Sequence, residues 1–178
     1  EHMINAMDRS SNRNFETCSH VILGIPGETH EMMMQTANEI SVLGFDAIKL
    51  HNLYAVKGTP LGTEVLEGKV KMMEYETYIK TLVDFLERIS PEVIVERISG
   101  DAPPDFLIAP KWCLKKSELR LAIEEEFKRR GTIQGSRWKA PEIAPSSRPI
   151  PPDLTPEKIS DHIEQRGRLP VLKLQDQP

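Results

Sequence analysis

Residues 18–31 read Cys-Ser-His-Val-Ile-Leu-Gly-Ile-Pro-Gly-Glu-Thr-His-Glu, and this stretch decides the fold. The apolar run Val21–Leu23 ends at the glycine-rich turn Gly24–Gly27, and an acidic segment follows. This order is typical of a buried strand that turns directly into a helix. Since glycine has no Cβ, a ligand can approach the backbone of the turn, where the free N–H groups of the next helix also point. The stretch therefore predicts the ligand-binding edge of a β/α unit.

Length, charge and cysteine content limit the class of protein. The chain has 178 residues and a net charge of −4, which suits one domain with or without a tail and gives no overall basic field. No apolar run approaches the roughly 18 residues of a membrane span, so we expect no membrane partner. Cys18 and Cys113 cannot form a disulfide framework. They indicate two reduced, packed thiols in a cytoplasmic protein.

Hydrophobic periodicity predicts an α/β fold with the order β-α-β-α-β-α. We expect a helix end in 1–13, strands at 17–24, 45–52 and 92–98, helices at 30–43, 72–89 and 116–130, and a helical turn at 61–67. Each segment between strands is long enough for a helical crossover, so the strands should be parallel and the crossovers right-handed.

The second strand indicates which kind of parallel sheet this is. Ile48 and Leu50 point to one face, whereas Lys49 and His51 point to the other. A doubly wound sheet would be apolar on both faces. Helices on one face and polar groups on the other suit the wall of a barrel. Because three strands cannot close a barrel, we expect a partial (β/α) barrel whose N-terminal portion is missing.

The composition changes after residue 135. Eight of the fourteen prolines follow this point, which disfavours regular structure. We therefore predict two parts: residues 1–135 as the barrel portion, and 136–178 as a Pro-rich, largely disordered tail. Within the tail, 136–154 should be flexible and one short helix should lie near 156–166.

Two groups of polar residues are candidates for a site. His20 and His51 can share one sheet face, but no third ligand stands at metal-binding spacing, so we predict no metal site here. Glu96, Arg97 and Asp101 cluster at the end of the third strand. They form either an ion-pair network that holds the loop or a clamp for a carboxylate or phosphate group.

The motifs resemble one family. Ile22–Thr29 is similar to the fifth-strand motif of radical SAM enzymes, and Gly58-Thr59-Pro60 is similar to the Gly-Thr-Pro element that follows it. The wider frame resembles a bacterial branch related to the radical SAM domain of the elongator catalytic subunit. The segments that carry this resemblance are His20, Lys49–His51, Lys57–Leu61, Arg97–Asp101, Leu107–Trp112 and Arg130–Gly135. The resemblance as a whole covers residues 17–135.

The resemblance implies a radical SAM enzyme, in which a [4Fe–4S] cluster binds S-adenosylmethionine and cleaves it to a radical. It implies that Ile22 and Gly24 contact the adenine and ribose side of S-adenosylmethionine through their backbone, and that His51 and Leu53 lie beside the adenine. The family's cluster ligands, a Cys-x3-Cys-x2-Cys loop, have no counterpart in this sequence, so the resemblance assigns no catalytic residue to it. Glu28 stands four residues after Gly24 rather than three, which leaves its role open.

Two functions remain open on the sequence. The first is the C-terminal part of a radical SAM enzyme with RNA modification as the suggested reaction class, inactive alone, whose partner is the missing N-terminal half of the barrel. The alternative is a stand-alone β/α module that binds a nucleotide or a partner protein without redox chemistry.

Overall fold

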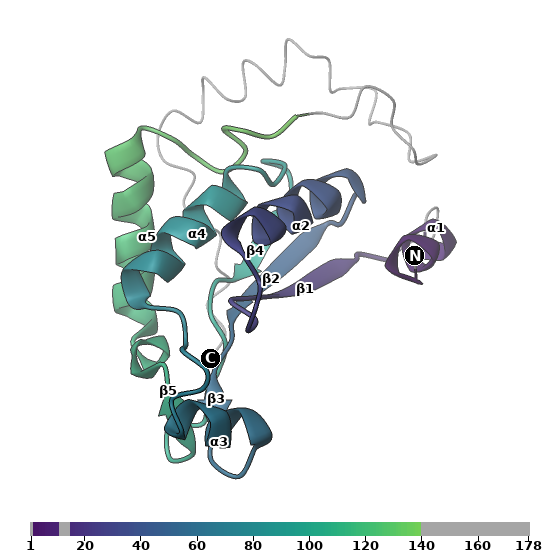
Figure 1. The fold of residues 1–178 in the computed structure, drawn as a ribbon. Coiled ribbons are helices and arrows are strands. Elements are labelled where there is room, and N and C mark those ends of the chain that lie inside the picture. The colour runs from purple at the N-terminus through teal and green to yellow at the C-terminus, as the bar shows by residue number, and fades with distance from the viewer. Residues whose placement is uncertain (1, 11–14, 140–178) are drawn as a thin grey trace, which may run out of the picture.

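The structure, a computed structural model, describes residues 2–10 and 15–139 (Figure 1). Within these ranges it is an α/β fold, as predicted. The predicted helix near 156–166 and most of the predicted flexible segment lie outside the described residues. No helix in the described ranges is long and apolar enough to cross a bilayer.

Three parallel strands form the main sheet. They are β1 (Cys18–Leu23), β2 (Ala47–Asn52) and β4 (Ile94–Arg97), in the spatial order β1-β2-β4. Helices α2 (His30–Val42) and α4 (Tyr75–Leu86) cover one face, and α5 (Lys116–Arg130) packs against α4 (Figure 1). The parallel sheet with helices on one face is therefore confirmed.

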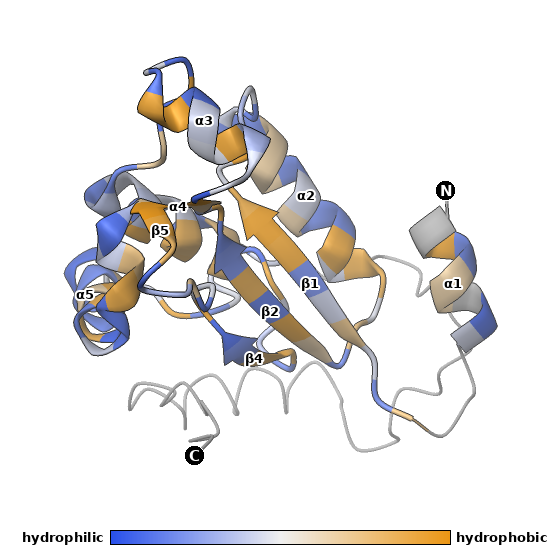
Figure 2. Ribbon diagram, turned by 90° about the horizontal axis from the view of Figure 1, so that it is seen from below, coloured by the Kyte–Doolittle hydropathy of each residue, from blue (hydrophilic) through white to orange (hydrophobic). Residues whose placement is uncertain are grey.

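The two faces of the sheet differ in burial. Val21, Leu23, Ile48 and Leu50 join the core beneath the helices. The opposite face, which no described helix covers, is turned toward the viewer in Figure 2. On that face Ile22 is 46% exposed and Ile94 is 47% exposed. The alternation predicted from the sequence is thus present, and it leaves apolar side chains on an open face.

The remaining elements are short. Strands β3 (Ala55–Val56) and β5 (Leu107–Ala109) pair antiparallel in a second small sheet, next to α3 (Pro60–Leu66). The 3-10 helix η1 (Lys111–Leu114) precedes α5, and α1 (His2–Ser10) lies before β1. The sequence did not predict β3, β5 or η1, because two to four residues are too few to show a hydrophobic period.

The helix ends follow from local chemistry. The Thr29 hydroxyl accepts the Met32 N–H at 3.3 Å and caps the start of α2. Gly44 follows this helix with a φ of +73°, the left-handed conformation typical of a C-terminal cap. Gly131 ends α5 with a φ of +65° and donates its N–H to Lys128 O.

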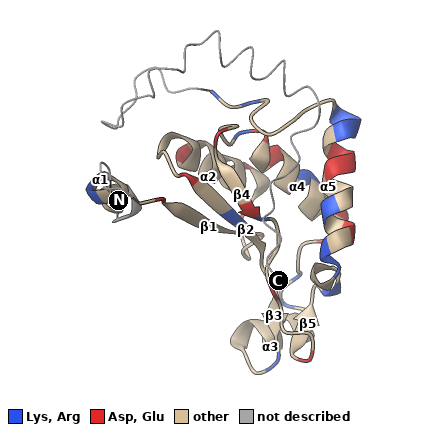
Figure 3. Ribbon diagram, turned by 180° about the vertical axis from the view of Figure 1, so that it is seen from behind, with Lys and Arg blue, Asp and Glu red and all other residues tan. Residues whose placement is uncertain are grey.

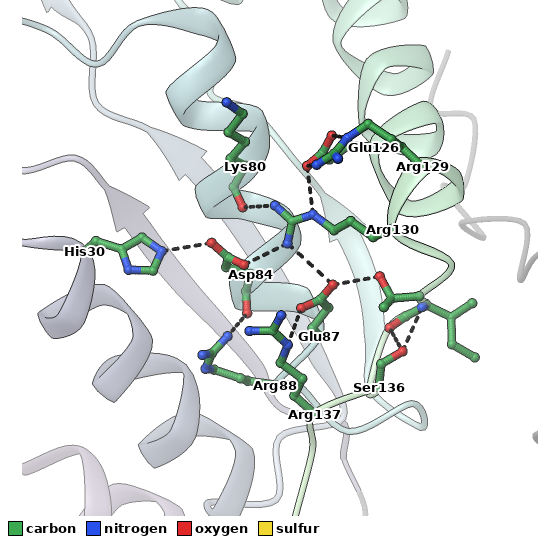
Figure 4. A network of polar contacts seen from close by, with 12 residues as sticks. His30, Lys80, Asp84, Glu87, Arg88, Glu126, Arg129, Arg130, Ser136 and Arg137 are labelled. Carbon is green, nitrogen blue, oxygen red and sulfur yellow. Dashed lines mark hydrogen bonds and ion pairs between the residues drawn. The ribbon is translucent and has the colours of Figure 1, made fainter.

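A network of charged side chains joins α4 to α5 (Figure 4). Arg130 contacts Asp84 Oδ1 and Glu126 Oε1, each at 2.7 Å, and Glu87 Oε1 at 3.4 Å. Asp84 also pairs with His30 of α2 at 2.9 Å. One guanidinium therefore links three carboxylates on two helices.

Glu87 is the buried member of this network. Its side chain is 0% exposed, and it accepts the Thr132 hydroxyl at 2.6 Å and pairs with Arg137 Nε at 2.8 Å. The Arg137 N–H also donates to Glu87 O at 2.7 Å. Arg137, which lies in the segment predicted to be flexible, is therefore held twice: the buried Glu87 carboxylate binds its side chain, and the Glu87 carbonyl accepts its backbone N–H.

Truncation around Arg137 should reveal this anchor. A chain that ends at Gly135 should lose about 1–2 kcal/mol of unfolding free energy relative to one that ends at Lys139, because Glu87 loses a charged partner. Chemical denaturation of the two truncated chains measures the difference. Equal midpoints would mean that Arg137 does not stabilise the fold.

Acid should weaken the same network. Hydrogen bonds from Arg129 and Arg130 lower the pKa of Glu126 to about 2, from an ordinary value of 4.5. Burial alone would raise the pKa of Asp84, but hydrogen bonds from Arg130 and His30 lower it overall. Both carboxyl groups have a lower pKa in the folded than in the unfolded chain. Their stabilising effect is therefore complete above the unfolded values and disappears as the pH falls toward 2.

We expect the thermal midpoint to fall between pH 5 and pH 2.5 as Glu126 and Asp84 take up protons. Glu126→Gln should be less stable than the parent chain at pH 7 and should lose less stability over this pH interval. Melting curves followed by circular dichroism test both statements. An unchanged acid-dependent loss in Glu126→Gln would contradict the assignment.

Candidate functional site

The four residues predicted to bind the cofactor lie side by side at the carboxyl ends of β1 and β2. Ile22 is the Cα partner of His51 in the parallel pairing. Gly24 follows β1 directly, and the N–H of Leu53 donates to Leu23 O at 3.1 Å. The expectation that both strand ends share one edge is confirmed. That these residues contact a cofactor stays a prediction.

The turn after β1 is closed by Glu28. The Glu28 N–H donates to Ile25 O at 2.9 Å, and its Oε2 accepts the N–H groups of Gly24 and Ile25 at 3.2 and 3.3 Å. Gly24 and Gly27 have φ values of +83° and +84°, which glycine adopts without strain. The sequence left the role of Glu28 open, and the structure gives it a place in shaping the turn. Its carboxylate faces the backbone N–H groups of residues 24 and 25.

Met73 is a site residue that sequence reasoning missed. A Cβ placed on Gly24 would lie 3.0 Å from Met73 Cε. The backbone of Gly24 is therefore covered on that side by a flexible methionine side chain, rather than being open to a ligand as expected. Trp112 Nε1 donates to Met73 O at 3.1 Å, which holds this segment in place. No sequence signal identified the contact, because Met73 lies 49 positions from Gly24.

His20 and His51 stack on the open sheet face, as expected for two inward-facing histidines. Their ring centroids are 5.7 Å apart with an interplanar angle of 19°. Burial, followed by the positive charges of Arg97, His20 and Lys49, lowers the pKa of His51. The imidazole is therefore neutral at pH 7. Its Nε2 is buried and has no hydrogen-bond partner among the described residues. An unpaired ring nitrogen at this place can bind one polar ligand atom.

The two thiols lie at opposite ends of the sheet. Cys18 begins β1, opposite Ala47, whereas the Cys113 side chain interacts with Asn52 at the other end of β2. Five residues of strand separate these ends, or roughly 16 Å. Burial is the main cause of a raised pKa in both thiols. In the described ranges, no group of three or more His, Cys, Asp or Glu residues is arranged to hold a metal ion.

The charged residues at the end of β4 form ion pairs with neighbouring segments. Glu96 pairs with Lys49 at 2.9 Å, and Arg97 Nη1 lies 2.5 Å from Asp101 Oδ2. Asp101 Oδ1 also contacts Lys116 Nζ, at the start of α5. The sequence predicted the cluster Glu96, Arg97 and Asp101 but not the two lysines, which join it only through tertiary contacts.

Removal of the Glu28 carboxylate should loosen the turn. In Glu28→Ala we expect the amide hydrogens of Gly24 and Ile25 to exchange about tenfold faster, which corresponds to about 1.4 kcal/mol for the lost hydrogen bonds. Glu31→Ala is the control, because this acid lies in the first turn of α2 and does not contact the two amides. Equal exchange in both variants would rule out a role for Glu28 in the turn.

This chain is similar in sequence to proteins of bacteria and archaea. The protein YtqA of Bacillus subtilis is 37% identical over 132 residues, which are 74% of this chain and 41% of that protein. The protein MJ0486 of Methanocaldococcus jannaschii is 37% identical over 137 residues, which are 76% of this chain and 42% of that protein. This chain therefore spans about two fifths of the length of these curated relatives.

A solved structure shows the same fold. An archaeal Elp3 from Methanocaldococcus infernus, with residues 1–46 deleted, superposes with a TM-score of 0.62 at 20% identity over 74% of this chain and 31% of that chain. The described elements therefore have the fold of the corresponding part of Elp3.

Residues 45–129 match the Radical_SAM C-terminal domain. This segment includes β2, β4 and most of α5, and with them two of the residues predicted to bind the cofactor, His51 and Leu53. Residues 45–129 of this chain therefore belong to the family of radical SAM C-terminal domains.

Proposed function

We propose that this chain supplies the C-terminal part of a radical SAM barrel and binds the adenosine side of S-adenosylmethionine at the carboxyl ends of β1 and β2. The observation that carries the proposal is the adjacency of Ile22, Gly24, His51 and Leu53 at one sheet edge. The match of residues 45–129 to the radical SAM C-terminal domain supports it.

The residues present fit the adenosine side of this cofactor. The backbone of residues 22–24 runs along this edge, where Met73 covers one side of Gly24, and the buried Nε2 of His51 is available for one hydrogen bond. A neutral imidazole suits a purine edge, because either of its ring nitrogens can accept while the other donates. S-adenosylmethionine would supply a 5′-deoxyadenosyl radical on one-electron reduction by a [4Fe–4S] cluster. The residues of this chain would bind and orient the nucleoside.

The described residues do not fit a [4Fe–4S] cluster. A site-differentiated cluster needs three thiolates close together, whereas Cys18 and Cys113 lie at opposite ends of the sheet. We therefore propose that any cluster is held by another part of the complete barrel, and we assign no step of the reaction to it here.

We propose further that the open sheet face is covered by the N-terminal half of a barrel. Ile22 and Ile94 are each almost half exposed on this face, and β1 is an edge strand of the described sheet. An exposed edge strand and apolar face favour association. Since the curated relatives are more than twice as long as the part that this chain matches, they have room for such a half. RNA as the substrate class rests only on the resemblance to the elongator catalytic subunit.

The test is anaerobic reconstitution with iron and sulfide, followed by an assay for 5′-deoxyadenosine. We expect product only when the chain is combined with the polypeptide encoded upstream in the same reading frame. His51→Ala should lower product formation at least tenfold, whereas Leu66→Ala, an exposed change on α3, should not. A four-iron cluster and product with the chain alone would overturn the proposal. Nucleotide binding without any product in the mixture would favour a stand-alone binding module.

A further inference from the structure

Two cations converge on one carboxylate beside the candidate site. Arg97 comes from the end of β4, Asp101 from the following turn and Lys116 from the first residue of α5. The carboxylate of Asp101 contacts Arg97 Nη1 through one oxygen and Lys116 Nζ through the other. All three side chains are partly exposed, between 37% and 56%. Figure 3 shows acidic and basic residues together on β4 and along α5.

The backbone around Asp101 is fixed. The N–H of Gly100 donates to the side-chain oxygen of the buried Asn52 at 3.0 Å. The Tyr54 hydroxyl donates to the carbonyl of Asp101 at 3.2 Å. A Cβ on Gly100 would lie only 2.9 Å from the Tyr54 ring, so the turn packs closely against the end of β2. Asp101 therefore holds the ends of two long, flexible side chains in a defined position.

The place of these cations is close to the ligand edge. Arg97 is the Cα partner of Lys49 in the pairing of β2 with β4, two residues before His51. Its positive charge is the second cause, after burial, of the lowered pKa of His51, which is consistent with a guanidinium near the imidazole. Lys49 pairs with Glu96 and is therefore balanced by its own partner.

The charges of the three residues do not cancel. One carboxylate faces two cations, so one positive charge remains without an anionic counterpart in this group. Exposed ion pairs of this kind contribute only about 0–1 kcal/mol to stability, so a stabilising role does not by itself account for the arrangement. A guanidinium and an ammonium held a short distance apart suit the oxygens of a carboxylate or phosphate group.

We infer that Arg97 and Lys116, positioned by Asp101, bind an anionic group of a ligand, a carboxylate or a phosphate, next to the candidate cofactor edge. This site is separate from the four residues that the cofactor proposal uses. Binding of an anion by these two cations does not require that the chain take part in radical chemistry. In a radical SAM reaction it would orient a substrate that carries such a group.

The test uses the 178-residue chain, labelled with 15N, and two probes at constant ionic strength: inorganic phosphate and malonate. We expect saturable shifts of the amide signals of Gly100, Asp101 and Lys116 with at least one probe. The probe that binds tighter identifies the source as phosphate or carboxylate. Arg97→Gln should weaken this binding at least tenfold, and Lys116→Gln at least threefold.

Lys115→Gln is the matched control. Lys115 adjoins Lys116, is similarly exposed and pairs with Glu118 instead of Asp101. This variant should bind the probe as the parent chain does, and the spectra of all variants show directly whether each is folded. Shifts that rise linearly without saturation, or that are the same in Arg97→Gln and Lys115→Gln, would overturn the inference. Neither result depends on S-adenosylmethionine. The outcome of this titration is therefore independent of the outcome of the reconstitution assay.

Discussion

Arg130→Met is expected to lower the free energy of unfolding by about 3–5 kcal/mol, because it removes a largely buried cation that three carboxylates share. The side chain of Arg130 is 15% exposed and that of Glu87 is 0% exposed. Arg130 also joins Asp84 and Glu126, so its loss affects three carboxylates at once. For a folded unit of this size the change corresponds to roughly 10–15 °C in the thermal midpoint. Thermal melts followed by circular dichroism at pH 7 measure it.

Arg129→Met is the matched control. Arg129 precedes Arg130 on the same helix and bonds to Glu126 as well, at 2.7 and 2.8 Å, but its side chain is 67% exposed. Its loss should cost less than about 1 kcal/mol, because Arg129 itself lies largely in water and Glu126 keeps Arg130 as a partner. The double variant Glu87→Gln with Arg130→Met should regain part of the lost stability, because the buried carboxylate that has lost one of its two arginine partners is then neutral. Equal losses of unfolding free energy in Arg129→Met and Arg130→Met would show that the burial of the arginine side chain does not determine its contribution to stability.

Gly62→Ala is the second change with a large expected effect. Within a helix, replacing glycine by alanine normally stabilises by about 1 kcal/mol. At this position, however, a Cβ would lie 2.2 Å from the carbonyl oxygen of Val56 and 2.9 Å from Ile108 Cδ1. The carbonyl belongs to β3 and cannot move without disturbing the small sheet. We therefore expect a loss of about 3 kcal/mol from overpacking, opposite in sign to the helix propensity.

Hydrogen exchange in α3 measures this loss directly. In Gly62→Ala the amides of Thr63 and Glu67, which donate to Thr59 O and Thr63 O, should exchange about a hundredfold faster than in the parent chain. Glu64→Ala, an exposed change in the same helix, should alter these rates less than threefold. Slower exchange in Gly62→Ala would mean that helix propensity outweighs the contact with β3.

The main sheet and its helices could be predicted because each is long enough to show a period. The spacing of Leu119, Ile123 and Phe127 predicted α5 over 116–130, and the structure has it at Lys116–Arg130. The alternation of Ile48 and Leu50 with Lys49 and His51 predicted the open sheet face. In contrast, β3 and β5 exist only because Ala55 and Val56 meet Leu107 and Ala109 in space.

The sequence by itself determined the parallel β/α order, the capping glycines, and the position of Gly24 and His51 at one edge. These features depend on local periodicity and on the direction of each strand, which neighbouring residues fix. Only the tertiary structure decided which charges meet: Arg130 with Glu87, Lys116 with Asp101, and Met73 over Gly24. These contacts join residues that are 15 to 49 positions apart in the chain. No local pattern encodes such pairs, because packing of the complete fold brings them together.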